Sequence, residues 1–141
     1  MQDRGVRPER TGWRDERISQ RHRRWGWDCP GVDLDFVFLE YDRGKAVAIV
    51  EYKHECAPPQ HKTTPTYQAL IDLGNRAGIP VFCARYADDF SWWKITSLND
   101  LAVNLLPGRP EFSEMEWVRF LYRLRGYDPP ASFDADEGVV L

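Results

Sequence analysis

Residues 32–55 read VDLDFVFLEYDRGKAVAIVEYKHE, a pattern typical of a β-hairpin with strands near 33–41 and 45–53. Apolar and polar residues alternate in both segments, so each side chain can be assigned to a face of the hairpin. One face of the first strand carries Asp33 and Asp35, and one face of the second carries Glu51 and Lys53. Whether these two faces coincide depends on the turn between the strands.

The turn of the hairpin contains Asp42-Arg43-Gly44. We predict a three-residue loop closed by a pair between Tyr41 and Lys45, because Gly44 can take the left-handed conformation that such a loop needs. A two-residue loop of Arg43-Gly44 would require a positive φ at Arg43, which a bulky side chain resists. The three-residue loop is therefore favoured.

The loop length controls whether charged side chains come together. With three loop residues, Asp35 lies opposite Glu51 and Asp33 lies opposite Lys53, so that two carboxylates and a lysine share one face. With two loop residues the register shifts by one, and Asp35 turns to the other face. Such a cluster is costly unless its charges are paired or bind a metal ion. The alternative is an ordinary solvent-exposed Glu-Lys pair across two strands.

Two carboxylates held by a rigid sheet suit a hard divalent cation, and oxygen ligands favour Mg²⁺, with Mn²⁺ able to substitute. A bound metal polarises a phosphoryl oxygen and lowers the pKa of a bound water. Lys53 follows Glu51 by two residues on the same face, where it can orient that water or stabilise developing negative charge. The pattern therefore indicates metal-assisted phosphodiester hydrolysis.

These residues resemble the motif of the PD-(D/E)XK nuclease superfamily, also called restriction-endonuclease-like. The match consists of Asp35 before a strand, then Glu51-Tyr52-Lys53 sixteen residues later at the end of an apolar strand. The resemblance covers roughly residues 13–97. It implies an αβββαβ core, a mixed β-sheet flanked by helices, to which this chain adds a C-terminal helix.

The resemblance also implies roles for individual residues. Asp35 and Glu51 would bind Mg²⁺, the main-chain carbonyl of Tyr52 would add a ligand, and Lys53 would assist the attacking water. Asp33 is the rival for the first carboxylate, because neither aspartate follows the proline that gives the motif its first letter. Gln68 resembles a glutamine of exonuclease-like members, although Asp72 stands where those members have a tyrosine. Some members have a further glutamate on the first helix, but Glu16 falls about 160° from Ile18 on a helical wheel, opposite the expected buried stripe, so we assign it no role.

The remaining elements follow from periodicity and from capping and breaking residues. We expect helices over residues 13–24, 65–77, 99–106 and 113–125, and strands over 79–86 and 91–97 that pair with each other. The predicted organisation is a disordered basic leader over 1–12, a single nuclease-like domain over 13–126 and an acidic flexible tail over 127–141.

Composition narrows the class of protein. The 141 residues contain no apolar run long enough to cross a membrane, and the N-terminus is polar, so we expect a cytoplasmic protein that does not bind membranes. The net charge is −3, yet residues 1–24 hold eight arginines against four acids, a local charge of +4. Arginine suits bidentate phosphate contacts. The candidates for contact with nucleic acid, DNA by the family resemblance, are Arg17, Arg21, Arg23 and Arg24.

Other patterns point elsewhere. Cys29, His54, Cys56 and His61 are a possible but poorly spaced zinc set, and a Cys-His nucleophile pair has no further support. Four tryptophans could stack on bases, although core positions are more usual: Trp25, Trp27, Trp92 and Trp93. Two alternatives to a nuclease remain. One is a module that keeps the nuclease fold and binds nucleic acid or protein without catalysis, and the other is a metal-free interaction protein. A homodimer is also plausible, since cutting both strands of a duplex often uses two sites.

Overall fold

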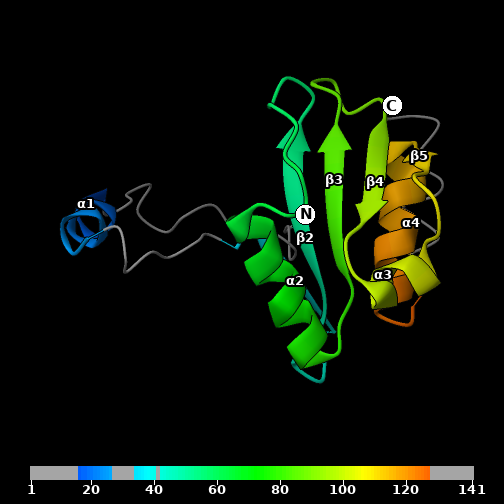
Figure 1. The fold of residues 1–141 in the computed structure, drawn as a ribbon. Coiled ribbons are helices and arrows are strands. Elements are labelled where there is room, and N and C mark those ends of the chain that lie inside the picture. The colour runs from blue at the N-terminus through cyan, green and yellow to red at the C-terminus, as the bar shows by residue number, and fades with distance from the viewer. Residues whose placement is uncertain (1–15, 27–33, 41, 128–141) are drawn as a thin grey trace, which may run out of the picture. The chain divides into compact units, whose positions relative to one another are not determined.

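The computed structural model describes residues 16–26, 34–40 and 42–127. The chain divides into two units, residues 1–33 and 34–141, which are described separately. The first contains helix α1 (Glu16–Arg24), whose last turn is basic (Figure 1). This helix matches the end of the helix predicted over 13–24, while residues 13–15 lie outside the described ranges. The predicted basic leader and all of the predicted acidic tail except Tyr127 also lie outside them.

The second unit is built on a mixed five-stranded sheet. Its strands lie side by side in chain order: β1 (Phe36–Glu40), β2 (Lys45–His54), β3 (Val81–Tyr86), β4 (Trp93–Ser97) and β5 (Glu111–Phe112). The β2–β3 pair is parallel and the other three pairs are antiparallel. Helices α2 (Pro65–Ala77), α3 (Asp100–Leu105) and α4 (Glu114–Leu124) flank the sheet (Figure 1). The predicted α/β class with a mixed, helix-flanked sheet is confirmed.

The order of elements differs from the αβββαβ core before α2 and also after β3, where β4, α3, β5 and α4 follow. Within the described residues, two strands and not three lie between α1 and α2. Strand β5 was not predicted, because its two residues directly follow the chain-breaking segment 107–110 and carry no alternating pattern of their own.

None of the helices in the described ranges has the length and apolar character that a membrane span requires.

The prediction of a three-residue hairpin loop is wrong. Glu40 and not Tyr41 pairs with Lys45, so residues 41–44 connect the strands. This register alone would turn Asp35 away from Glu51. A β-bulge restores the predicted facing, because Leu39 pairs with Ala46 while Phe38 pairs with Ala48.

The buried carboxylate of Glu40 explains the longer loop. Its oxygens accept hydrogen bonds from the backbone N–H groups of Asp42 and Arg43, and from Nε of Arg43. Burial raises the pKa of Glu40, but the hydrogen bonds from Arg43 and Asp42 outweigh it and hold the pKa below its usual value. Arg125 at the end of α4 adds a contact of 3.5 Å. Gly44 takes the predicted left-handed conformation, with φ of 62°.

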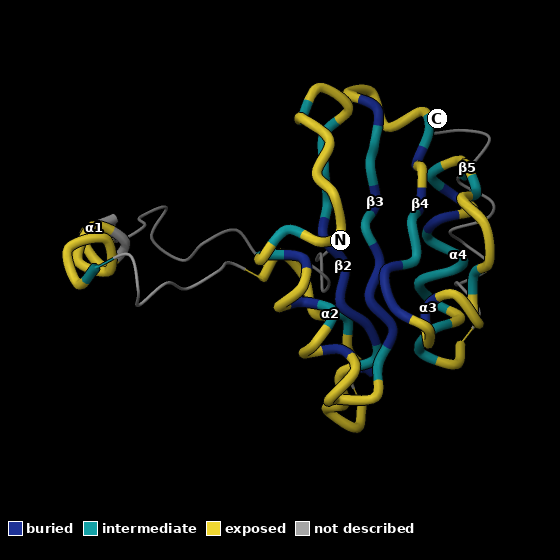
Figure 2. The backbone as a smooth tube through the Cα atoms, in the orientation of Figure 1, coloured by how far each residue is buried: buried dark blue, intermediate teal, exposed yellow. Residues whose placement is uncertain are grey.

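Each face of the sheet has its own apolar cluster, which follows from the alternation of side chains along the strands. On one face, α4 contributes Trp117 to a cluster with Val50, Phe82 and Ile95. On the other, α2 contributes Tyr67 and Leu70 to a cluster with Ile49, Val81 and Leu98. The buried residues gather along β2 and β3, at the centre of the sheet (Figure 2). We call these the α4 face and the α2 face.

Helix ends and close approaches follow the sequence closely. Pro65 opens α2, Gly78 ends it with φ of 72°, and Ser113 and Glu116 form the predicted capping box of α4. Thr64 occupies the N-cap position of α2, but its side chain makes no capping hydrogen bond. A Cβ at Gly74 would lie 2.2 Å from Cγ2 of Val81, so this glycine lets α2 pack directly on β3.

Candidate metal centre

Asp35 and Glu51 lie on the same face of the sheet. The pairing of Phe36 with Val50 puts Asp35 next to Glu51 in register, at the point where β1 begins. Phe36 contacts Tyr52 on the α4 face, so its neighbour Asp35 faces α2. Oδ2 of Asp35 accepts a hydrogen bond of 3.2 Å from the backbone N–H of Tyr52. The predicted facing of the two carboxylates is therefore present.

Lys53 joins the pair of carboxylates. Its Nζ lies 3.5 Å from Oε1 of Glu51. Glu51 is almost fully buried, and its Oε2 is buried without a hydrogen-bond partner among the described residues. Burial is the main cause that raises the pKa of Glu51, and the charge of Asp35 raises it further, whereas Lys53 lowers it. The carboxylate of Glu51 is thus incompletely compensated by its protein neighbours.

The main chain of Tyr52 offers a further oxygen. The N–H and C=O groups of a strand residue project toward the same neighbouring strand. The N–H of Tyr52 reaches Asp35 on the β1 side of β2. The C=O of Tyr52 therefore also points to the β1 side, past Phe36, where the pairing of β1 with β2 begins. The Tyr52 ring lies on the α4 face, where its hydroxyl accepts a hydrogen bond of 3.2 Å from Nε1 of Trp117. This anchor fixes the strand between Glu51 and Lys53.

The donor set fits Mg²⁺ better than a metal that needs an all-protein cage. In the part of the chain that the structure describes, no group of three or more His, Cys, Asp or Glu side chains is arranged to hold a metal. Mg²⁺ is commonly held by one or two carboxylates, with waters and substrate phosphate completing its shell. The unpartnered Oε2 of Glu51 supplies the buried negative oxygen that such an ion needs. A proton competes for this oxygen, so metal affinity is expected to increase with pH.

Of the other predicted site residues, only Gln68 lies in the described part of this unit. Asp33, the rival first carboxylate, lies outside the described residues. Gln68 points to the preceding loop, where its Nε2 donates a hydrogen bond to the carbonyl of Lys62. The four α1 arginines belong to the other unit and are exposed: Arg17, Arg21, Arg23 and Arg24.

The structure gives the zinc set no support. Nδ1 of His54 accepts a hydrogen bond from the N–H of Cys56, and its Nε2 lies 2.9 Å from Asp88. Both ring nitrogens are therefore engaged. Nδ1 of His61 contacts the hydroxyl of Thr63, and Cys29 lies outside the described residues.

The tryptophans named in the sequence behave differently from one another. Trp93 is a core residue of the α4 face. Its neighbour in the strand, Lys94, points to the other face, because consecutive strand residues alternate. Trp92 is partly exposed and carries Nζ of Lys94 over its ring at 4.8 Å. Trp25 is exposed on the other unit, and Trp27 lies outside the described residues.

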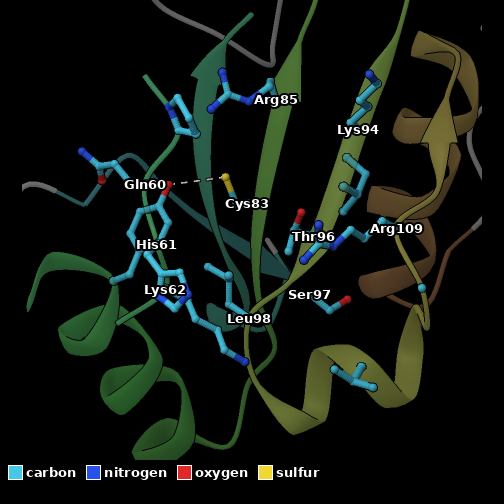
Figure 3. Close-up of a pocket in the computed structure, with 15 residues that line it drawn as sticks. Gln60, His61, Lys62, Cys83, Arg85, Lys94, Thr96, Ser97, Leu98 and Arg109 are labelled. Atoms are coloured by element: carbon cyan, nitrogen blue, oxygen red, sulfur yellow. Dashed lines mark hydrogen bonds between the residues drawn. The ribbon is translucent and has the colours of Figure 1, made fainter. Parts of the chain in front are cut away.

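Sequence reasoning missed a row of cations beside the carboxylates. Lys53, Arg85 and Lys94 are register partners on β2, β3 and β4, and all three lie on the α2 face. Arg85 and Lys94 line a pocket of about 500 Å³ that also includes Cys83, the register partner of Glu51 (Figure 3). The sequence contains only part of the information needed to predict this row. Alternation along β3 and β4 predicts which face each cation occupies, but it does not predict the register that aligns the cations.

The comparisons with known proteins add no relative: no protein-family model, no curated protein and no solved structure was found to match this chain.

Proposed function

We propose that this protein is a metal-dependent nuclease, which hydrolyses nucleic-acid phosphodiester bonds at the centre formed by Asp35, Glu51 and Lys53. The observation that carries the proposal is the buried, unpartnered Oε2 of Glu51, set beside a second carboxylate and a lysine on one face of the sheet. A buried carboxylate with an unsatisfied oxygen is costly. Binding of a metal ion by this oxygen would explain why the protein keeps a buried carboxylate that lowers its stability.

Asp35, Glu51 and the carbonyl of Tyr52 are the groups that would hold Mg²⁺. When bound, the ion supplies Lewis-acid polarisation of the phosphoryl oxygen and a water that ionises near neutral pH. Asp35 is exposed and can turn toward solvent and substrate, while Glu51 is fixed by burial. The pair thus combines one anchored ligand with one adaptable ligand.

Lys53 has two positions available. In the metal-free protein it compensates Glu51 at 3.5 Å, with 22% of its side chain exposed. If a cation neutralises Glu51, the ammonium is released to orient the attacking water or to stabilise negative charge on the phosphate. The mobile four-carbon stem of lysine permits this exchange, whereas a rigid arginine fork would not.

DNA is proposed as the substrate because of the family resemblance, with the α1 arginines contacting the phosphate backbone. A second candidate is a nucleic-acid-binding module that does not cut. The existing Glu51–Lys53 ion pair favours it, because this pair already offsets part of the carboxylate charge without a metal.

Cleavage assays separate the two candidates. The purified chain is incubated with plasmid and with single-stranded DNA in Mg²⁺, Mn²⁺ or EDTA. We expect cutting that requires the metal, and a loss of about 10²-fold or more in Lys53→Ala, because that variant lacks the charge that stabilises the transition state. Arg76→Ala is the matched control, since Arg76 is exposed on α2 and its ion pair among the described residues is with Asp72. Binding without cutting under every condition would establish the non-catalytic module.

A further inference from the structure

A pocket on the α2 face collects positive charge beside the proposed metal centre. The described residues that line it include four cations and no acid: Lys62, Arg85, Lys94 and Arg109. Residues 25–110 hold eight bases and eleven acids, so half of these bases line one pocket in a net acidic part of the chain. Positive charge concentrated in a concave site attracts anions.

The pocket adjoins the carboxylates directly. Cys83 lies on its floor and is the register partner of Glu51, and Thr96 continues the same row on β4. Two residues further toward the C-terminal end of β2, the aligned residues on the same face are all cations. They are Lys53 on β2, Arg85 on β3 and Lys94 on β4. Because neighbouring strands lie about 4.8 Å apart, these three Cα atoms span about 10 Å across the sheet.

The cations of the pocket keep their charge available. Arg85 donates from Nη1 to the neutral carbonyls of His54, Glu55 and Ala57. Lys94 lies 3.9 Å from Glu111, but both side chains are more than half exposed, so water and salt screen this pair.

Lys62 and Arg109 lie on opposite sides of the pocket. Lys62 belongs to the loop before α2, and Arg109 to the segment between α3 and β5, with Thr96 and Ser97 on the β4 side (Figure 3). Both cations are exposed and can reach a bound anion from two directions. The hydroxyl of Thr96 adds a neutral hydrogen-bonding group, whereas that of Ser97 donates to the carbonyls of Ala102 and Leu106.

The size of the pocket limits what can enter. A volume of about 500 Å³ falls in the range of small-molecule sites, roughly 300 to 1,000 Å³. Such a volume suits roughly one nucleotide-sized group, which a double helix cannot place there without separating its strands.

We propose that this pocket binds the phosphate backbone of a single nucleic-acid strand, which crosses β2, β3 and β4 next to the metal centre. The inference rests on the proposed function for the location of the scissile phosphate, but the binding itself does not require cleavage. It assigns a substrate class, a single strand or a frayed end, and gives Lys62 and Arg109 the role of backbone contacts.

The test measures binding by fluorescence anisotropy without divalent ions, using Glu51→Gln so that cutting is excluded. The probe is a labelled oligothymidylate of about 12 nucleotides, within the size range of single-strand sites. We expect Lys62→Ala with Arg109→Ala to weaken binding about fivefold to tenfold, and to lower the salt dependence by about 1.4, or 0.7 for each phosphate contact. Arg123→Ala, an exposed arginine on α4, is the control and should bind as its parent does.

Two competitors identify the ligand. A blunt duplex of the same length and the free mononucleotide should each compete at least about tenfold less well than the single strand. Equal competition by the duplex would overturn the single-strand assignment, and equal competition by the mononucleotide would show a nucleotide pocket instead of a strand groove. Absence of oligonucleotide binding, or the same affinity in the double variant, would refute the proposal. Failure of the nuclease proposal appears separately, as an absence of cutting by the wild type.

Discussion

Glu51→Gln is expected to reduce metal-dependent strand cleavage by about 10³-fold or more, the size of effect seen when a central electrostatic group is removed. Gln keeps the shape of the side chain but removes the negative charge that a cation requires. The buried position of Glu51 makes replacement by water or by another carboxylate unfavourable. Initial rates on a labelled oligonucleotide, measured at several Mg²⁺ concentrations, give the size of the effect.

Glu55→Gln is the matched control for this substitution. Glu55 lies four residues further on, is exposed, and uses Oε2 to accept a hydrogen bond of 2.7 Å from the backbone of Asp88. A glutamine oxygen can still accept that bond, so cleavage should change by less than about twofold. Equal rates for wild type and Glu51→Gln would remove Glu51 from the mechanism. Melting temperatures of both variants in EDTA show whether either loss of activity reflects unfolding.

Trp117→Ala is expected to lower the free energy of unfolding by about 3 to 5 kcal/mol, the usual cost of truncating a large buried aromatic residue. Trp117 is 2% exposed and packs against Trp93 and Phe120. Its Nε1 also donates to the hydroxyl of Tyr52, which loses this partner in the variant. For a small domain with about 5 to 15 kcal/mol of stability, the loss leaves the native state marginal.

Urea unfolding followed by circular dichroism measures this loss. Trp117→Phe keeps most of the apolar volume and should cost clearly less than the alanine variant, so it gives a second measurement if Trp117→Ala does not fold. Trp92→Ala, at a partly exposed position, should cost less than about 1 kcal/mol. Equal stability of Trp117→Ala and wild type would show that α4 does not anchor the sheet.

The facing of the proposed site residues could be predicted because alternation is a local property of each strand. Asp35 and Glu51 do share a face, but a β-bulge and not a three-residue loop brings them together. The sequence of the loop did not reveal that Glu40 would be buried and bind the backbone of Asp42 and Arg43. That interaction lengthens the loop, and the bulge compensates for the extra residue.

The cationic pocket could not be predicted for a different reason. Arg85 and Lys94 occupy strands that are adjacent only through long-range pairing, while Lys62 and Arg109 come from separate loops. Their juxtaposition depends on the register of β3 against β4 and on where α2 packs. The clustered arginines of residues 1–24 are visible in the sequence because they are close together along the chain, whereas the four pocket cations are spread over residues 62–109.

The most direct test of the proposed metal centre is anomalous diffraction from crystals grown or soaked with Mn²⁺ above pH 7. We predict a peak in contact with the carboxylates of Asp35 and Glu51 and with the carbonyl of Tyr52, which disappears in Glu51→Gln. An Mn²⁺ peak elsewhere, or no peak while Glu51 stays paired with Lys53, would contradict the assignment of these residues as metal ligands.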